Sequence, residues 1–128
     1  MIPEDRALTS LDALRPRQIW QDVTARYVQS ERITMSVVEI PPGGLVPAHA
    51  HENEQVGLCL SGSVVFTVGE EKGELGPRGM WRIPANVPHE VQAGPEGALV
   101  VECFSPVRDD WSGLPEAPDA PVRWPFEA

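Results

Sequence analysis

Residues 43–62 read GGLVPAHAHENEQVGLCLSG, and this stretch carries two of the three histidines of the chain. His49 and His51 lie two residues apart, so on a strand both imidazoles would project from one face and reach one cation. Gln55 follows four residues after His51 and shares that face if the strand continues. The third histidine, His89, follows the proline-flanked turn IPANVP, which would present it rigidly from a neighbouring strand. The stretch therefore predicts a metal site built on β structure.

Short apolar runs surround this stretch and indicate further strands. Apolar and polar side chains alternate from Ile33 to Val37, which is typical of a half-buried strand. Other apolar runs, bounded by glycine, proline or turn residues, lie at 56–60, 63–68, 80–83 and 97–104, and residues 70–73 read as an exposed hairpin tip. Strands at a spacing of roughly 8–12 residues, with no helical period after Ser30, predict a sandwich or barrel.

The composition describes one acidic globular domain. The 128 residues include 14 prolines and 11 glycines, and this length suits a single core. A net charge of −9 disfavours nucleic acid, because its phosphates would be repelled. No apolar run approaches the ~18 residues that span a bilayer, and the first twenty residues lack the apolar stretch of a secretory signal. We therefore expect a cytoplasmic protein without membrane or nucleic-acid partners, in which Cys59 and Cys103 are buried thiols rather than a disulfide.

Composition divides the chain into three segments: an N-terminal extension at 1–30, a core at 31–104 and a proline-rich tail at 105–128. The extension holds one candidate short helix, capped by Thr9 or Ser10. The tail contains five prolines and is expected to lie extended over the surface. Trp111, Trp124 and Phe126 are the candidates to pin it there.

The histidine stretch resembles the first motif of the cupin superfamily. The correspondence runs Gly43-(x5)-His49-x-His51-(x3)-Gln55-(x6)-Gly62, with glutamine where many cupins carry glutamate. The turn before His89 is similar to the second motif, and it departs at Arg78 and Asn86, where glycines are expected, and at Ala93, where asparagine is usual. The resemblance covers roughly residues 31–104. It implies an all-β single domain, the double-stranded β-helix or cupin jelly-roll barrel, with the metal inside.

A finer resemblance indicates the single-domain cupins of pectin degradation, the KdgF type. The segments Glu54–Gly57 and Phe104–Trp111 carry it. Proteins of this type convert 4,5-unsaturated uronates to open-chain 5-keto-4-deoxyuronates. The resemblance implies metal ligands, an acid on the last barrel strand and two substrate-binding residues; by position these are His49, His51, Gln55 and His89, then Glu102, then Phe104 and Arg108. Glu102 departs from the aspartate expected at its position.

The implied ligand set has a chemical consequence. Three neutral imidazoles and an amide oxygen suit one divalent transition metal such as Ni, Zn, Fe, Co or Mn. Because no ligand is anionic, the ion would keep its full charge and polarise a bound oxygen strongly. This favours Lewis-acid chemistry on an anionic substrate.

Glu102 has two interpretations, because it follows an apolar run in which a lone carboxylate is expensive. In the functional interpretation, burial raises its pKa until the carboxyl can exchange protons near neutrality. In the structural interpretation, the carboxylate forms a salt bridge with Arg108 or Arg82.

The two substrate-binding candidates also have structural interpretations. Arg108 either captures a substrate carboxylate through two parallel hydrogen bonds or pairs with Asp109 or Asp110. Phe104 either forms a platform for the substrate or belongs to the core, as most apolar strand residues do.

Three functions fit these residues. The first is a metal-dependent, isomerase-like enzyme that acts on an unsaturated uronate, a small anionic sugar. In this enzyme Arg108 would hold the substrate carboxylate and Glu102 would move protons during ring opening and ketonisation. The alternatives are a metal-dependent dioxygenase and a small-molecule sensor or binding module without turnover. By analogy with other small cupins, we expect a homodimer.

Overall fold

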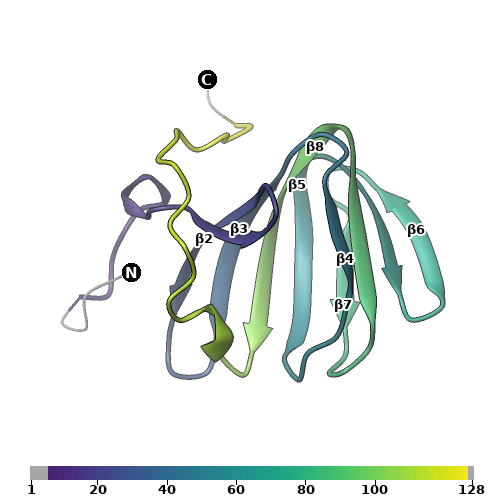
Figure 1. The fold of residues 1–128 in the computed structure, drawn as a ribbon, viewed down its shortest axis with the longest axis horizontal. Helices are drawn as coiled ribbons and strands as arrows, with labels where there is room; N and C mark the ends of the chain where they lie inside the picture. Colours follow the sequence, from purple (N-terminus) through teal and green to yellow (C-terminus); the bar gives the residue numbers. More distant parts are fainter. Residues whose placement is uncertain (1–5, 127–128) are drawn as a thin grey trace.

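The computed structural model describes residues 6–126 and consists almost entirely of antiparallel strands (Figure 1). The elements in chain order are a 3-10 turn η1 (Leu11–Ala13), β1 (Arg17–Trp20), β2 (Val23–Gln29), β3 (Thr34–Ile40), β4 (Leu45–His49), β5 (Glu54–Val68), β6 (Glu71–Leu75), β7 (Met80–Ile83), β8 (His89–Ser105) and a 3-10 turn η2 (Asp109–Trp111). Across these described residues, no helix is long and apolar enough to cross a membrane.

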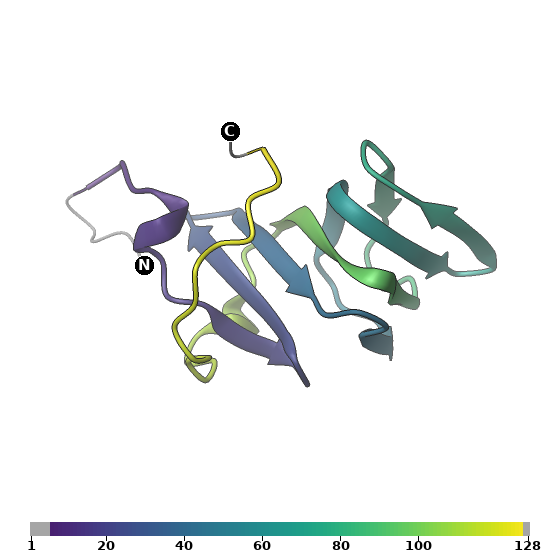
Figure 2. The same cartoon turned by 90° about the horizontal axis from the view of Figure 1, so that it is seen from above.

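The two long strands, β5 and β8, pair with each other along almost their whole length and divide the structure into two sheets. The first part of β5 and the last part of β8 lie in sheet I, which has the order β1-β2-β3-β8-β5-β7. Their other halves lie in sheet II, which has the order β4-β8-β5-β6. The two sheets meet in the core, where the rings of Phe66 and Trp81 lie 4.6 Å apart. This arrangement confirms the predicted double-stranded β-helix, although the strand ladder does not close on itself (Figure 2).

Glycines allow the long strands to pass from one sheet to the other. The pairing register shifts on both sides of Ser61 and Gly62, and Gly62 and Gly97 adopt φ angles of 75° and 76°. A Cβ at Gly62 would collide with the carbonyl oxygen of Gly97, so the two backbones approach this closely only because residue 62 carries no side chain. A Cβ at Gly97 would in turn collide with the carbonyl oxygen of Ile40. Consequently, the runs predicted as separate strands at 56–60 and 63–68 form one bent strand.

The predicted alternation in β3 is present, but the polar side chains face inward. Thr34 and Ser36 are 0% and 1% exposed, whereas Ile33 and Met35 are 52% and 49% exposed. The buried hydroxyls are satisfied by neighbouring strands and loops, since Ser36 Oγ donates to the carbonyl oxygen of Glu102 at 3.0 Å. Thr34 Oγ1 accepts a hydrogen bond from the backbone N–H of Arg108 at 2.9 Å. The inner face of sheet I is therefore partly polar.

The first thirty residues contribute two strands to sheet I. β2 pairs with β3 over six consecutive residue pairs, and β1 pairs with β2, so the sheet begins well before residue 31. The predicted short helix is reduced to the 3-10 turn η1, and Ser10 at its N-cap makes no side-chain hydrogen bond. The alternation of Val23, Ala25 and Tyr27 with polar residues reflects this strand.

The C-terminal tail runs across the outer side of sheet I (Figure 1). Trp111 pins its start, because its ring is 5% exposed and its carbonyl accepts a hydrogen bond from Tyr27 Oη. Further along, Arg26 donates to the carbonyl oxygen of Ala120. Trp124 and Phe126, which are 38% and 64% exposed, pack on each other instead of on the core, so the prediction that they pin the tail was wrong.

Candidate metal centre and its cavity

The three histidines converge at one end of the space between the sheets. His49 ends β4 and pairs with His89, the first residue of β8. His51 lies in the loop after β4, not on the same strand as His49, so the predicted shared strand face is wrong in detail. Nevertheless, one ring nitrogen from each histidine lies within 4.8 Å of the others. The loop between β4 and β5, rather than a continuous strand, therefore brings the His51 imidazole to the other two.

Each imidazole ring is held by the same kind of backbone contact. Nδ1 of His49, His51 and His89 lies 2.8–2.9 Å from the carbonyl oxygens of Pro47, Asn53 and Val87, each two residues away in sequence. A carbonyl oxygen can only accept, so Nδ1 carries the proton and Nε2 carries a lone pair. Burial lowers the pKa of all three rings, for His89 to about 4, which keeps them neutral near pH 7.

Gln55 joins this group from sheet I. It is the second residue of β5, so it belongs to a different strand from the histidine pair, yet its Oε1 lies 3.1 Å from His51 Nε2. With His51 protonated on Nδ1, both facing atoms are acceptors and need a positive partner. His89 Nε2 is buried and has no hydrogen-bond partner within residues 6–126. This donor set fits a divalent cation with imidazole and amide ligands.

The turn before His89 is anchored to the loop that carries His51. The backbone N–H of Asn86 donates to the carbonyl oxygen of His51 at 2.8 Å, and Asn86 adopts a φ of 64°. Arg78 adopts a φ of 76°. These are two of the positions where the motif expects glycine, and their left-handed backbone explains that expectation. The motif geometry is therefore retained with other residues.

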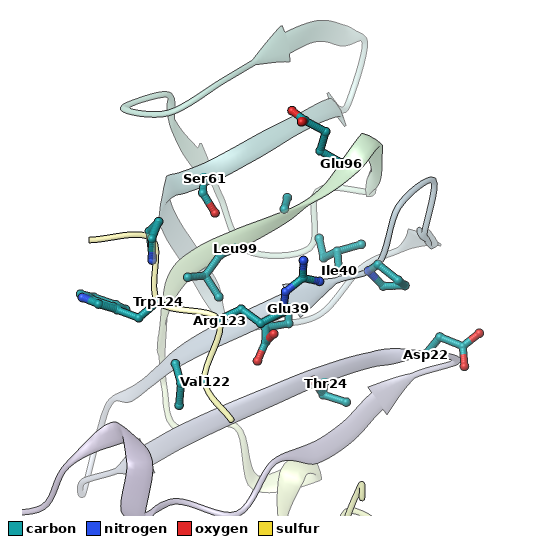
Figure 3. A pocket seen from close by; sticks show the side chains of 13 residues that line it. Asp22, Thr24, Glu39, Ile40, Ser61, Glu96, Leu99, Val122, Arg123 and Trp124 are labelled. Carbon is teal, nitrogen blue, oxygen red and sulfur yellow. The ribbon is translucent and has the colours of Figure 1, made fainter. Parts of the chain in front are cut away.

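A cavity of about 160 Å³ begins at the candidate metal ligands and runs between the two sheets. Its lining includes six of the seven site residues predicted from the sequence: His49, Gln55, His89, Glu102, Phe104 and Arg108. His51 belongs to the same group through its contact with Gln55. A larger groove of about 550 Å³ lies on the outer side of sheet I under the tail, and its lining contains none of these seven residues (Figure 3).

Glu102 faces the cavity from β8, where it lies between Ser36 and Gly57 of the neighbouring strands. Burial raises the pKa of its carboxyl to about 8, while the Trp81 indole and the Arg108 charge oppose this shift. Glu102 Oε2 and Trp81 Nε1 are both buried, and neither has a partner of hydrogen-bonding geometry in the described part of the chain. In the metal-free chain, burial therefore favours the protonated form of this carboxyl near neutral pH.

The salt bridge considered for Glu102 is absent among residues 6–126. Arg82 is exposed on the opposite side of sheet I, and Arg108 forms its ion pair with Asp110 instead. Nε and Nη2 of Arg108 donate to the two carboxylate oxygens of Asp110 at 3.0 and 2.9 Å. This contact lowers the pKa of the Asp110 carboxyl.

Aromatic rings fix the Arg108 guanidinium at the cavity. Its central carbon lies 4.7 Å from the ring centroids of both Phe104 and Trp111, a distance at which cations are attracted to aromatic faces. Phe104 is 4% exposed, and its ring centroid lies 5.8 Å from that of His51. Phe104 therefore belongs to the core and also forms part of the cavity wall. Asp110 occupies one edge of the guanidinium, and Nη1 has no protein partner in the described chain.

Sequence reasoning missed two walls of the cavity. Ile19 and Trp20 come from β1, and the Trp20 ring lies 5.1 Å from His49. Trp111, a predicted anchor of the tail, also lines the cavity beside Leu114. The alternation of apolar and polar residues from Val23 onward could have revealed the first wall. A strand there would place Ile19 and Trp20, which precede it, at the edge of the core.

Comparison with known proteins identifies the family. Residues 36–104 match the cupin domain family, which is more than half of the chain. The chain belongs to this family. Oxalate decarboxylase OxdC from Bacillus subtilis (strain 168) is 30% identical over 90 residues, which cover 66% of this chain and 23% of that protein. The chain therefore spans about a quarter of the length of this curated relative.

Solved structures agree with the family. An RmlC-like cupin from Shewanella frigidimarina NCIMB 400 superposes with a TM-score of 0.78 at 19% identity, over 83% of this chain and 96% of that one, which shows the fold. KdgF from Halomonas sp. superposes with a TM-score of 0.69 at 25% identity, over 74% of this chain and 88% of that one. The predicted resemblance to KdgF is confirmed.

Proposed function

We propose that this cupin is a metal-dependent enzyme that opens the ring of a 4,5-unsaturated uronate and tautomerises the product to a keto-deoxyuronate. One observation carries the proposal: a small cavity joins the histidine group to a buried carboxyl, Glu102, whose pKa burial raises, and to a guanidinium, Arg108, that lies between two aromatic rings. The likeness to KdgF supports the substrate class.

In this proposal His49, His51, Gln55 and His89 hold one divalent ion. When bound, such an ion supplies Lewis-acid chemistry by polarising a substrate oxygen. The Nδ1 contacts keep the imidazoles oriented before the ion arrives, so little reorganisation is needed.

Arg108 binds the substrate carboxylate in this scheme. The edge that includes Nη1 is open for the carboxylate, because Asp110 occupies only the Nε–Nη2 edge. Phe104 and Trp111 keep the guanidinium in place, and Trp20 helps to exclude water from the opposite wall. The cavity of about 160 Å³ is smaller than the roughly 300–1,000 Å³ pockets that hold drug-sized ligands. It therefore suits a monosaccharide better than a longer saccharide.

Glu102 moves a proton in this scheme. The conversion is an isomerisation in which the C1 hydroxyl loses a proton, C4 gains one, and the bond between C1 and the ring oxygen breaks. A carboxyl with a pKa of about 8 can exchange a proton with one of these positions near neutrality. The expected aspartate is replaced here by glutamate, whose longer side chain reaches further into the cavity.

The proposal is tested with the purified chain after loading with Ni, Zn, Fe, Co or Mn in turn. Loss of the ultraviolet absorbance of the conjugated double bond reports turnover of a 4,5-unsaturated monouronate. We expect turnover with at least one ion and none after chelation. Glu102→Gln should bind the metal yet turn over at least ~100-fold more slowly. Thermal stabilisation by the uronate without turnover would instead identify a binding module.

A second candidate, decarboxylation of a small dicarboxylate, is favoured by the 30% identity to oxalate decarboxylase. A cavity of this size with one guanidinium would also admit such a ligand. Release of carbon dioxide from oxalate, with no loss of uronate absorbance, would support this candidate over the isomerase.

A further inference from the structure

The inner face of sheet I carries one row of residues that leads away from the cavity into the core. Strand register aligns Ser36 of β3, Glu102 of β8, Gly57 of β5 and Trp81 of β7. Glu102 lines the cavity, whereas Trp81 is not among the lining residues and packs on Phe66 in the core. Trp81 therefore lies behind Glu102, where it can contact the carboxyl without contacting a ligand.

Gly57 allows the Trp81 indole to extend across β5 toward Glu102. A Cβ at residue 57 would collide with Nε1, Cε2 and Cζ2 of Trp81, so this edge of the indole rests on the glycine backbone. Strands in a sheet lie about 4.8 Å apart, so side chains on β7 and β8 must span roughly 9.6 Å to meet. They can do so here because the residue between them has no side chain.

Other polar groups near the carboxyl already have partners. Ser36 Oγ donates to the backbone carbonyl oxygen of Glu102, not to its carboxyl. Nε and Nη2 of Arg108 donate to Asp110. Trp81 Nε1 and Glu102 Oε2, in contrast, are both buried and both without a partner within residues 6–126. Burying an unpaired donor beside an unpaired acceptor costs free energy, and one hydrogen bond between them would remove both costs.

We propose that Trp81 is a positioning residue for Glu102: its indole N–H donates to Oε2 when the carboxyl is ionised and leaves the other oxygen facing the cavity. A hydrogen bond to a carboxylate is roughly twice as strong as one to a neutral acceptor, so the contact favours the ionised form. In agreement, the indole is the larger of the two influences that oppose the raised pKa of Glu102. The other is the Arg108 charge.

The consequence for catalysis rests on the proposed function. When Glu102 gives its proton to C4 of the uronate, a buried carboxylate remains until the proton released by the C1 hydroxyl restores the acid. The indole keeps its own proton throughout and stabilises this transient charge. Because Trp81 does not line the cavity, we expect its loss to change kcat rather than KM.

The contact is tested in the metal-free chain by NMR of the indole N–H groups. The chain has four tryptophans, and Trp81→Phe identifies the signal of residue 81. Raising the pH from about 6 to 10 ionises Glu102, while burial keeps the three histidines neutral. The Trp81 indole proton should then move downfield, because it enters a charge-assisted hydrogen bond. The signal of Trp124, which packs on Phe126, should stay in place.

The matched control for this titration is Glu102→Gln. It removes the ionising carboxyl and retains the other groups near it, namely Arg108, the cavity histidines and the neighbouring thiol of Cys103, whose pKa burial raises. The Trp81 signal should not move with pH in this variant. A signal that moves in the wild type alone therefore reports the contact with the carboxylate.

The catalytic role is tested with the metal-loaded enzyme and the uronate. Trp81→Phe should lower kcat about tenfold and leave KM within about twofold, because a hydrogen bond to a charged group is lost. The apparent pKa of Glu102 in the pH profile of kcat should rise by about 1, since the carboxylate loses its donor. Ile83→Val is the control for lost packing on β7, because Ile83 is buried and donates no side-chain hydrogen bond. This variant should leave the pH profile in place.

Two results would overturn the proposal. One is a Trp81 indole signal that does not move with pH in the wild type, or that moves equally in Glu102→Gln. The other is a folded Trp81→Phe enzyme whose pH profile equals that of the wild type. If Trp81→Phe does not fold, assignment of the indole signals in the wild type keeps the first test decisive. A chain that turns over no uronate would refute the proposed function and not the contact, because the indole signals are measured without metal or substrate.

Discussion

In one part of sheet I, the inner and outer faces reverse the usual relation between polarity and burial. Inward-facing Ser36, Gln55 and Glu102 are polar and at most 7% exposed, whereas outward-facing Met35 and Val56 are apolar and about half exposed. Burying these polar groups costs free energy, which is expected for a site that uses them and is otherwise unfavourable. Contiguous apolar side chains on the outer face are unusual for a surface exposed to water. The difference teaches that the polarity of a side chain does not by itself predict which face of this sheet it occupies.

The largest expected effect comes from removing a metal ligand on the inside. His89→Ala should abolish tight metal binding and, with it, a stabilisation of about 2.7 kcal/mol at a metal concentration 100 times the Kd. Metal content by elemental analysis and melting with and without chelator provide the measurement. Met35→Ala, on the outer face, is the control and should retain the metal. Stoichiometric metal in His49→Ala/His89→Ala would contradict the site.

The next effect is a change in pH dependence caused by Glu102. The folded, metal-free protein raises the pKa of this carboxyl from 4.5 to about 8, so it binds more protons than the unfolded chain within that range. The contribution of this group to stability therefore falls as pH rises from 4.5 to 8, by an amount on the order of 3–5 kcal/mol. The lowered pKa values of the three histidines act in the opposite direction below about pH 6.5, so the decline is expected above that pH. Glu102→Gln should abolish this decline in denaturant unfolding followed from pH 6.5 to 9.

The comparison for Glu102 is Glu54→Gln, which removes a carboxylate from the exposed outer face of β5. This variant should keep the wild-type decline of stability with pH. An equal decline in the Glu102→Gln protein would show that the buried carboxyl does not hold its proton.

A moderate effect is expected at Arg108. Arg108→Lys should raise KM for an anionic substrate about tenfold, because an ammonium group cannot reproduce the planar guanidinium between Phe104 and Trp111. Asp110→Asn should lower KM a few-fold, because it weakens a contact that competes for the guanidinium. Steady-state kinetics on the uronate measure both. Equal KM values in the wild type and both variants would assign the arginine to structure alone.

The smallest effect is expected from Gln55→Glu, which keeps shape and adds one charge next to the metal. Metal affinity should rise about threefold, and turnover should fall because the ion would be partly neutralised. Chelator competition and kcat provide the readouts. Val56→Glu adds the same charge one residue later on the outer face and should leave metal affinity unchanged. Unchanged affinity in Gln55→Glu would remove Gln55 from the ligand set.

The strands and the metal group were predictable from the sequence because each rests on local spacing. The pattern at Ile33–Val37 correctly predicted a strand. It could not predict which face of that strand is buried, because alternation identifies the buried face only where the interior is apolar. Gln55 and His51 were expected to meet because they would share one strand face. They do meet, but because the loop after β4 carries His51 and β5 carries Gln55. Long-range partners such as Trp20, whose ring lies beside His49, leave no local signal of their contacts.

A single strand, β8, carries His89 at one end and Glu102 and Phe104 at the other. One continuous backbone therefore fixes which way His89, a candidate metal ligand, and the buried Glu102 carboxyl face relative to each other. An insertion of one residue in the bend between Gly94 and Gly97 would turn every later side chain of β8 to the opposite face. Such an insertion would send Glu102 to the solvent and bring Val101 and Cys103 into the cavity. The length of the bend therefore determines which face of the sheet the later residues of β8 occupy. A change by two residues would keep Glu102 inside, whereas a change by one residue would expose it to solvent.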